Sequence, residues 1–68
     1  MDFTIQYFGE FDRLLYLESV DVNEMAEALE RAREVLRQPP TLDDEPRPVG
    51  YVILDERGRQ VARGYRRG

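Results

Sequence analysis

The sequence predicts an α+β domain of two layers, in which a four-stranded antiparallel sheet carries one helix on one of its faces. Three patterns support this prediction: a two-residue alternation near the N-terminus, a helical spacing of apolar residues in the middle, and an apolar run followed by a turn near the C-terminus. With 68 residues, the chain is expected to form a single domain, 1–68, with a thin core.

Two strands are expected in the N-terminal third. Residues 2–8 place apolar side chains at every second position, which is the period of a half-buried strand. Residues 9–12 are typical of a turn, and residues 13–20 form a second apolar run. The two runs therefore predict a hairpin.

A helix is expected to begin at Asp21. Its carboxylate can cap the first turn, and Glu24 stands three residues later, as in an acidic version of a capping box. Apolar residues then recur at spacings of three and four. The proline pair at 39–40 ends the helix near residue 37 or 38, because proline disfavours helical geometry in the residue before it.

The C-terminal third predicts a second hairpin. Residues 49–54 are apolar on both faces, as a central strand would be. Residues 55–58 form a turn with Gly58 at the left-handed position, and residues 60–66 return as the last strand. A fully antiparallel sheet then has the strand order 2-1-3-4. We expect the following core: Phe3, Ile5, Tyr7, Leu15, Leu17, Met25, Leu29, Ala32, Leu36, Ile53 and Val61.

The residue types argue against an enzyme and against a bound cofactor. There is no Cys and no His, and only Thr4, Ser19 and Thr41 carry aliphatic hydroxyls. The glycines are isolated and none precedes the helix, so no phosphate-binding loop is expected. The acidic run 43–45 lies beside prolines and lacks the shaped, glycine-containing loop of a calcium site. We therefore expect no catalytic residue, no metal site and no cofactor.

Neither a leader nor a membrane segment is expected from the sequence. The first residues have no basic and no apolar region of a signal peptide, and no apolar run approaches about 20 residues. A cytoplasmic location is the expectation that follows.

The charges are unevenly distributed. Residues 1–45 hold twelve acids and four arginines, a net charge of −8, whereas residues 46–68 hold two acids and six arginines, a net charge of +4. The acids of one surface lie on the helix and in the following loop: Glu24, Glu27, Glu30, Glu34, Asp43, Asp44 and Glu45. They form either a solvated face that keeps a small domain soluble or an anionic surface for a basic partner, such as a protein that handles nucleic acid.

A second candidate surface is the sheet face that one helix leaves uncovered. Some of the apolar strand residues must lie there, namely members of the set Phe8, Leu14, Tyr16, Val52 and Leu54. Such a patch is either covered by loops or marks an interface, with Tyr16 as its candidate contact. A homodimer through this face or through an edge strand is the related expectation.

The last hairpin is rich in arginine and forms a third surface. Its candidate residues for phosphate contacts and base stacking are Arg57, Arg59, Arg63, Tyr65 and Arg66. The other interpretation is that these charges prevent edge-to-edge pairing of sheets. Nucleic acid is the less favoured partner because the first 45 residues repel it.

Residues 26–36, the following apolar strand and residues 55–59 together resemble short uncharacterised bacterial domains of strand-strand-helix-strand-strand type. In size and acidity, the chain is also similar to phage-encoded anti-CRISPR proteins. That resemblance implies a small inhibitor that binds a protein, and it carries over no residue. We therefore expect a non-enzymatic protein-binding module or inhibitor, with nucleic-acid binding through the last hairpin as the alternative.

Overall fold

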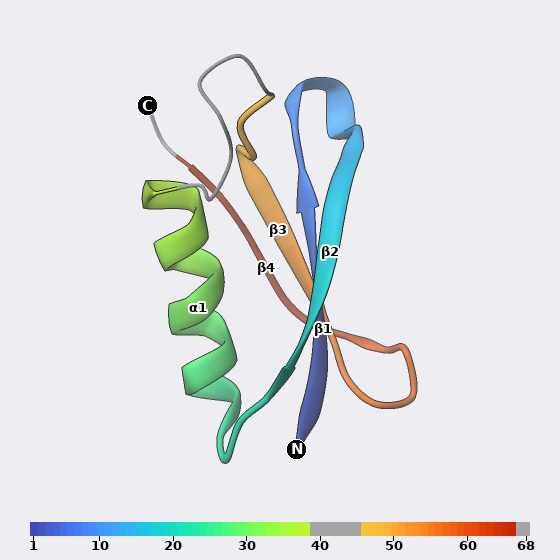
Figure 1. Ribbon diagram of the computed structural model, residues 1–68. Helices are drawn as coiled ribbons and strands as arrows, with labels where there is room; N and C mark the ends of the chain where they lie inside the picture. Colours follow the sequence, from blue (N-terminus) through green and yellow to red (C-terminus); the bar gives the residue numbers. More distant parts are fainter. Residues whose placement is uncertain (39–45, 67–68) are drawn as a thin grey trace.

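The computed structural model describes residues 1–38 and 46–66, and its elements follow the order strand, strand, helix, strand, strand (Figure 1). The strands are β1 (Asp2–Phe8), β2 (Leu14–Asp21), β3 (Gly50–Leu54) and β4 (Gln60–Tyr65). The helix is α1 (Met25–Arg37), and a short 3-10 turn, η1 (Glu10–Asp12), joins β1 to β2. All strand pairs are antiparallel in the order β2-β1-β3-β4, which confirms the predicted fold class and strand order.

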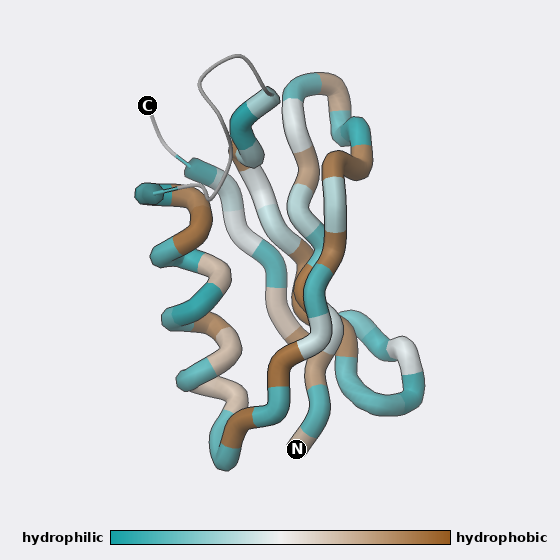
Figure 2. Tube along the Cα trace, viewed as in Figure 1, coloured by the Kyte–Doolittle hydropathy of each residue, from teal (hydrophilic) through white to brown (hydrophobic). Residues whose placement is uncertain are grey.

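Helix α1 lies against one face of the sheet and leaves the other face open (Figure 1). Hydrophobic and hydrophilic residues alternate along α1 in Figure 2, as expected for a helix with one inward face. The core between the two layers consists of Phe3, Ile5, Tyr7, Ala28, Ala32, Val35, Leu36, Tyr51 and Ile53. Both central strands supply this core because they lie directly beneath the helix.

The register of the first hairpin contradicts two predictions for β2. Tyr7 pairs with Tyr16, so Tyr16 shares the helix-covered face with Tyr7 rather than lying on the open face. Leu17 pairs with Gln6 on the open face and is 53% exposed, so its predicted place in the core is wrong. A bulge between Tyr7 and Phe8 fixes this register, and a shift of one residue reverses the face of every side chain.

Other core predictions are also wrong at the ends of elements. Met25 begins α1 and is exposed. Val61 is exposed because its neighbour Ala62 pairs with the buried Ile53 and takes the inward position. Leu15 and Leu29 are half-buried, whereas the core members that the prediction omitted are Ala28, Val35 and Tyr51.

The helix begins later than predicted because Asp21 belongs to β2. Asp21 pairs with Asp2, and the following Val22 N–H donates to the Met1 carbonyl at 2.9 Å. The strand therefore continues through the position that was expected to cap the helix. Glu24 occupies the cap position, and the Glu27 carboxylate accepts the Asn23 N–H at 2.9 Å. The predicted helix end is confirmed, since α1 ends at Arg37.

The turn between β3 and β4 forms as predicted. Gly58 has a φ of 81°, the left-handed geometry that glycine adopts without steric cost. The Asp55 carboxylate accepts the backbone N–H groups of Arg57 and Arg59, each at 2.9 Å. These hydrogen bonds stabilise the turn, which lies at the same end of the sheet as the N-terminus (Figure 1).

Candidate functional site

The predicted acidic surface is only partly available as a binding site. Glu24, Glu30 and Glu34 are exposed on α1, but Glu27 already accepts a backbone hydrogen bond at the helix start. The loop acids Asp43, Asp44 and Glu45 lie outside the described residues. Acids on the first turns of α1 also interact favourably with the positive end of the helix dipole. Part of this surface therefore has a structural explanation.

Tyr16 does not belong to an exposed patch. Its ring packs beside the ring of Tyr7, with centroids 5.0 Å apart and an interplanar angle of 36°. On the open face, the exposed apolar side chains are instead Leu14 and Leu17 of β2 and Val61 and Tyr65 of β4. Each of the two edge strands thus exposes apolar side chains on the open face.

The tip of the first hairpin exposes an aromatic residue that the sequence analysis placed in a turn without a function. Phe11 is 98% exposed, more than any other large hydrophobic residue among those described. Its φ is 61° and that of Asp12 is 57°, so two consecutive non-glycine residues are left-handed. This geometry costs about 1–2 kcal/mol per residue. A bulky apolar residue held in a strained turn and in water is a signal for a binding role.

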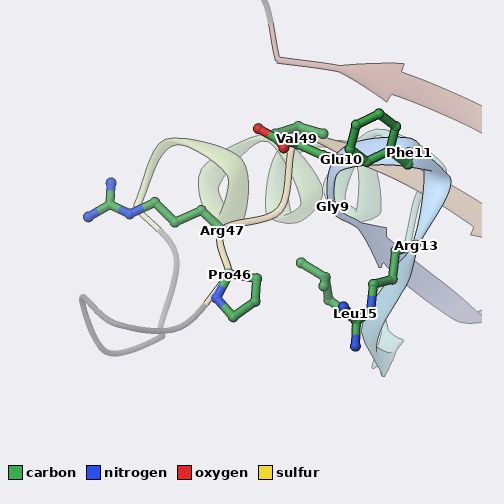
Figure 3. Close-up of a pocket in the computed structure, with 8 residues that line it drawn as sticks. All are labelled: Gly9, Glu10, Phe11, Arg13, Leu15, Pro46, Arg47 and Val49. Carbon is green, nitrogen blue, oxygen red and sulfur yellow. The ribbon is translucent and has the colours of Figure 1, made fainter.

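A shallow cavity lies behind this tip. It has a volume of about 510 Å³ and lies between the first hairpin and residues 46–49. Leu15 extends toward Pro46 across it, while the guanidinium group of Arg47 extends away (Figure 3). We call Phe11, Leu15 and Pro46, apolar residues that line this cavity, the tip surface.

The structure separates the arginines of the last hairpin into two groups. Arg57 and Arg59 lie at the β3–β4 turn, where the Arg59 guanidinium pairs with Asp55 at 3.1 Å. The pKa of the Asp55 carboxyl is lowered, and the hydrogen bond from the backbone N–H of Arg59 is the largest cause. The Arg57 N–H and the Arg59 guanidinium lower this pKa further. Arg63 and Arg66 lie toward the opposite end of β4.

The second group has partners that the sequence analysis did not identify. Arg33 and Arg37 of α1 line a cavity of about 430 Å³ together with Arg63 and Arg66, and Tyr51 and Tyr65 also line it. Arg63 and Tyr65 pair with Val52 and Gly50 on the open face, so the cavity extends around the edge strand β4. We call these four arginines and two tyrosines the arginine hollow. The helical spacing of Arg33 and Arg37 places them on one side of α1, which was a usable signal, but only the packing of α1 on the sheet brings them to β4.

A partly buried polar cluster joins the two layers. The Tyr7 hydroxyl donates to Glu18 at 2.8 Å, and Glu18 accepts two hydrogen bonds from Arg31 at 2.9 and 3.2 Å. Arg31 lowers the pKa of Glu18, whereas burial and then the Glu18 hydrogen bond raise the pKa of Tyr7. These directions keep Glu18 charged and Tyr7 neutral, which suits a structural link between strand and helix.

Within the described ranges, no group of three or more Asp, Glu, His or Cys residues has the arrangement of a metal site. No helix in those ranges is long and apolar enough to cross a membrane. Comparison of the chain with protein-family models gives no match, and comparisons with curated proteins and with solved structures give none. The function must therefore be argued from the surfaces themselves.

Proposed function

We propose that the protein is a non-enzymatic protein-binding module that acts by occupying a surface of its partner, as a small inhibitor does. The observation that carries this proposal is the 98% exposure of Phe11 on a left-handed backbone. Aromatic residues that fill a pocket of a partner are typical energetic centres of protein interfaces. The contact that we propose is the insertion of Phe11 into such a pocket, with the tip surface around it.

Typical interaction free energies favour the aromatic residue, rather than the charged residues, as the main contact. Burying a phenylalanine side chain contributes about 1.5–3 kcal/mol. An exposed ion pair contributes about 0–1 kcal/mol. Phe11 is therefore the anchor, and Leu14 and Leu17 extend the apolar contact along the edge strand β2.

The charges beside the anchor indicate the chemistry of the partner. Glu10 and Asp12 flank Phe11 on both sides, Arg13 follows them, and the whole chain has a net charge of −4. A pocket with arginine or lysine at its rim complements this arrangement. A symmetric contact between two tips would bring four carboxylates together, so a second copy of the chain is the less suitable occupant. We therefore propose a basic partner protein.

Site-specific photocrosslinking in the native cells tests the contact. The photoreactive analogue p-benzoylphenylalanine replaces Phe11 in one variant and Tyr65, another exposed aromatic residue, in a matched control. We expect position 11 to crosslink to a basic protein that position 65 does not reach. With that protein purified, Phe11→Ala should weaken binding about thirtyfold or more, since an anchor contributes at least about 2 kcal/mol.

The same binding measurement separates the tip from the acidic helix surface. The variant Glu30→Arg with Glu34→Arg reverses two exposed charges on α1 and should change the affinity only slightly. If the charge-reversed helix variant loses binding while Phe11→Ala keeps it, the binding site lies on α1 and not at the tip. If position 11 crosslinks only to a second copy of this chain, the contact belongs to a homodimer and the proposal of a partner protein is wrong.

A further inference from the structure

The arginine hollow gathers four arginines beside the edge strand β4. Arg33, Arg37, Arg63 and Arg66 form no ion pair with any residue of 1–38 or 46–66. The C-terminal end of α1 supplies about half a negative charge. Four guanidinium groups outweigh it, so the hollow favours an anion even though the chain as a whole is acidic.

The aromatic ring of Tyr65 beside the hollow indicates what kind of anion would bind there. Tyr65 is 63% exposed, and its ring lies over Gly50, where an added Cβ would be 2.9 Å from a ring carbon. The ring is thus held against the sheet because Gly50 has no side chain. Tyr51 and Tyr65 also line a smaller cavity of about 220 Å³ that Phe8 borders, so the two cavities adjoin. The ring of Tyr65 therefore lies between a cationic hollow and a smaller cavity that is mostly apolar, with Asp12 as its one charged lining residue.

We propose that the arginine hollow binds a nucleotide unit, with the arginines on the phosphate and Tyr65 stacked on the base. Guanidinium groups match phosphate oxygens in bidentate geometry. An exposed aromatic ring on a sheet stacks with any base. The volume of about 430 Å³ lies within the range of small-ligand sites. The source of the unit is either a free nucleotide or a single-stranded nucleic acid, which share this chemistry.

This site differs from the predicted arginine surface of the last hairpin. Arg57 and Arg59 lie at the opposite end of β4, and Arg59 is already paired with Asp55. Arg33 and Arg37 replace them as phosphate contacts. The site is also distinct from the tip surface, so either proposal can fail while the other holds.

Fluorescence anisotropy with a short labelled oligo(dT) tests the site, at about 50 mM salt where attraction to phosphate is strong. We expect salt-dependent binding by the intact chain. The variant Arg37→Gln with Arg63→Gln should weaken it about tenfold or more and reduce the log–log salt slope by roughly 1.4, for two lost phosphate contacts. The control variant Arg13→Gln with Arg57→Gln removes the same charge elsewhere and should keep the slope.

Tyr65→Leu tests the stacking contact separately. Loss of one stacked base should weaken binding roughly five- to hundredfold while the salt slope stays unchanged. If binding were only electrostatic, Tyr65→Leu would leave the affinity unchanged. Circular dichroism melting checks that each variant is folded, and all substituted side chains are exposed.

Competition identifies the source of the ligand. Displacement of the labelled oligonucleotide by a nucleoside monophosphate indicates a free nucleotide, whereas displacement only by unlabelled oligonucleotide indicates a nucleic-acid strand. Absence of binding at low salt overturns the proposal. Equal losses in the two arginine variants, or displacement by polyglutamate as effective as by oligo(dT), overturn it as well.

Discussion

The hydroxyl of Tyr7, a completely buried residue, donates a 2.8 Å hydrogen bond to the carboxylate of Glu18 on the neighbouring strand. Because Glu18 also accepts two hydrogen bonds from Arg31, this one carboxylate ties β1, β2 and α1 together. A charged residue can therefore occupy the inward face of β2 without leaving a buried polar group unsatisfied.

Glu18→Ala should destabilise the fold by about 1–3 kcal/mol, because the buried Tyr7 hydroxyl loses its acceptor. Glu18→Gln keeps an acceptor and should cost less. Arg31→Ala removes the exposed partner and should cost only about 0–1 kcal/mol. Urea denaturation of the three variants measures these differences. A Glu18→Ala variant as stable as the parent would show that Tyr7 finds another acceptor.

The free energy of unfolding should fall at acid pH, partly because Glu18 becomes protonated. The Arg31 guanidinium and then the Tyr7 hydroxyl lower the pKa of Glu18 in the folded state from its ordinary value of 4.5. A carboxyl with a lowered folded-state pKa stabilises the fold above the unfolded-state pKa, and this contribution is lost as pH falls through the folded-state pKa. Glu18→Gln should therefore flatten the pH dependence of the unfolding free energy below about pH 4.5.

Asp55 provides the comparison for that titration. Hydrogen bonds from the turn also lower its pKa, so its contribution has the same sign. The Asp55 carboxylate accepts its hydrogen bonds within the turn alone, whereas Glu18 also holds the buried Tyr7 hydroxyl, so Asp55→Asn should alter the acid limb less than Glu18→Gln. A larger effect of Asp55→Asn would assign the acid sensitivity to the turn.

The fold class, the strand order and the Gly58 turn were predictable because they depend on local patterns. Alternation, helical spacing and turn residues are properties of neighbouring positions, and the strands, the helix and the turn that they predict are all present in the structure. The inward face of β2 was not predictable in the same way. It depends on the bulge beside Phe8, and the leucines of β2 suggested the wrong face. Glu18 pairs with the buried Ile5 and so shares the inward face, where it accepts hydrogen bonds from Tyr7 and Arg31.

The candidate sites depend even more on tertiary structure. Phe11 stood in a predicted turn, but its exposure and left-handed backbone are properties of the folded hairpin. Arg33 and Arg63 are thirty residues apart in the sequence and line one cavity only because α1 packs on the sheet. Arg57 and Arg63 belong to one hairpin, yet they lie toward opposite ends of β4. Sequence proximity therefore groups arginines that the structure places apart.

Substitutions at two apolar residues test the register of the sheet. Ile53→Ala should cost about 2–5 kcal/mol because Ile53 is completely buried under α1. Leu17→Ala should change stability by no more than about 0.5 kcal/mol because Leu17 lies on the open face. Thermal unfolding of both variants gives the comparison. A large cost for Leu17→Ala would mean that β2 presents its leucines to the core after all.

Gly64→Ala should cost about 1–3 kcal/mol through overpacking. An added Cβ would lie 2.5 Å from the Tyr51 hydroxyl oxygen, and Tyr51 is buried and unable to move without disturbing the core. Gly58→Ala serves as the control, since nothing lies within 4 Å and only the positive φ opposes the change, at about 1 kcal/mol. Equal stability of Gly64→Ala and the parent would show that Tyr51 shifts easily.

Phe11→Asn should raise the stability of the isolated protein by a few tenths to about 1 kcal/mol. Asparagine tolerates the left-handed geometry that Phe11 adopts, and no packing is lost because the phenylalanine ring is exposed. The same substitution should abolish capture of the basic partner, because the apolar anchor is gone. Denaturation and binding measured on one preparation reveal the two opposite effects. A destabilised Phe11→Asn variant would mean that Phe11 supports the hairpin, and the strained aromatic tip would no longer argue for a partner.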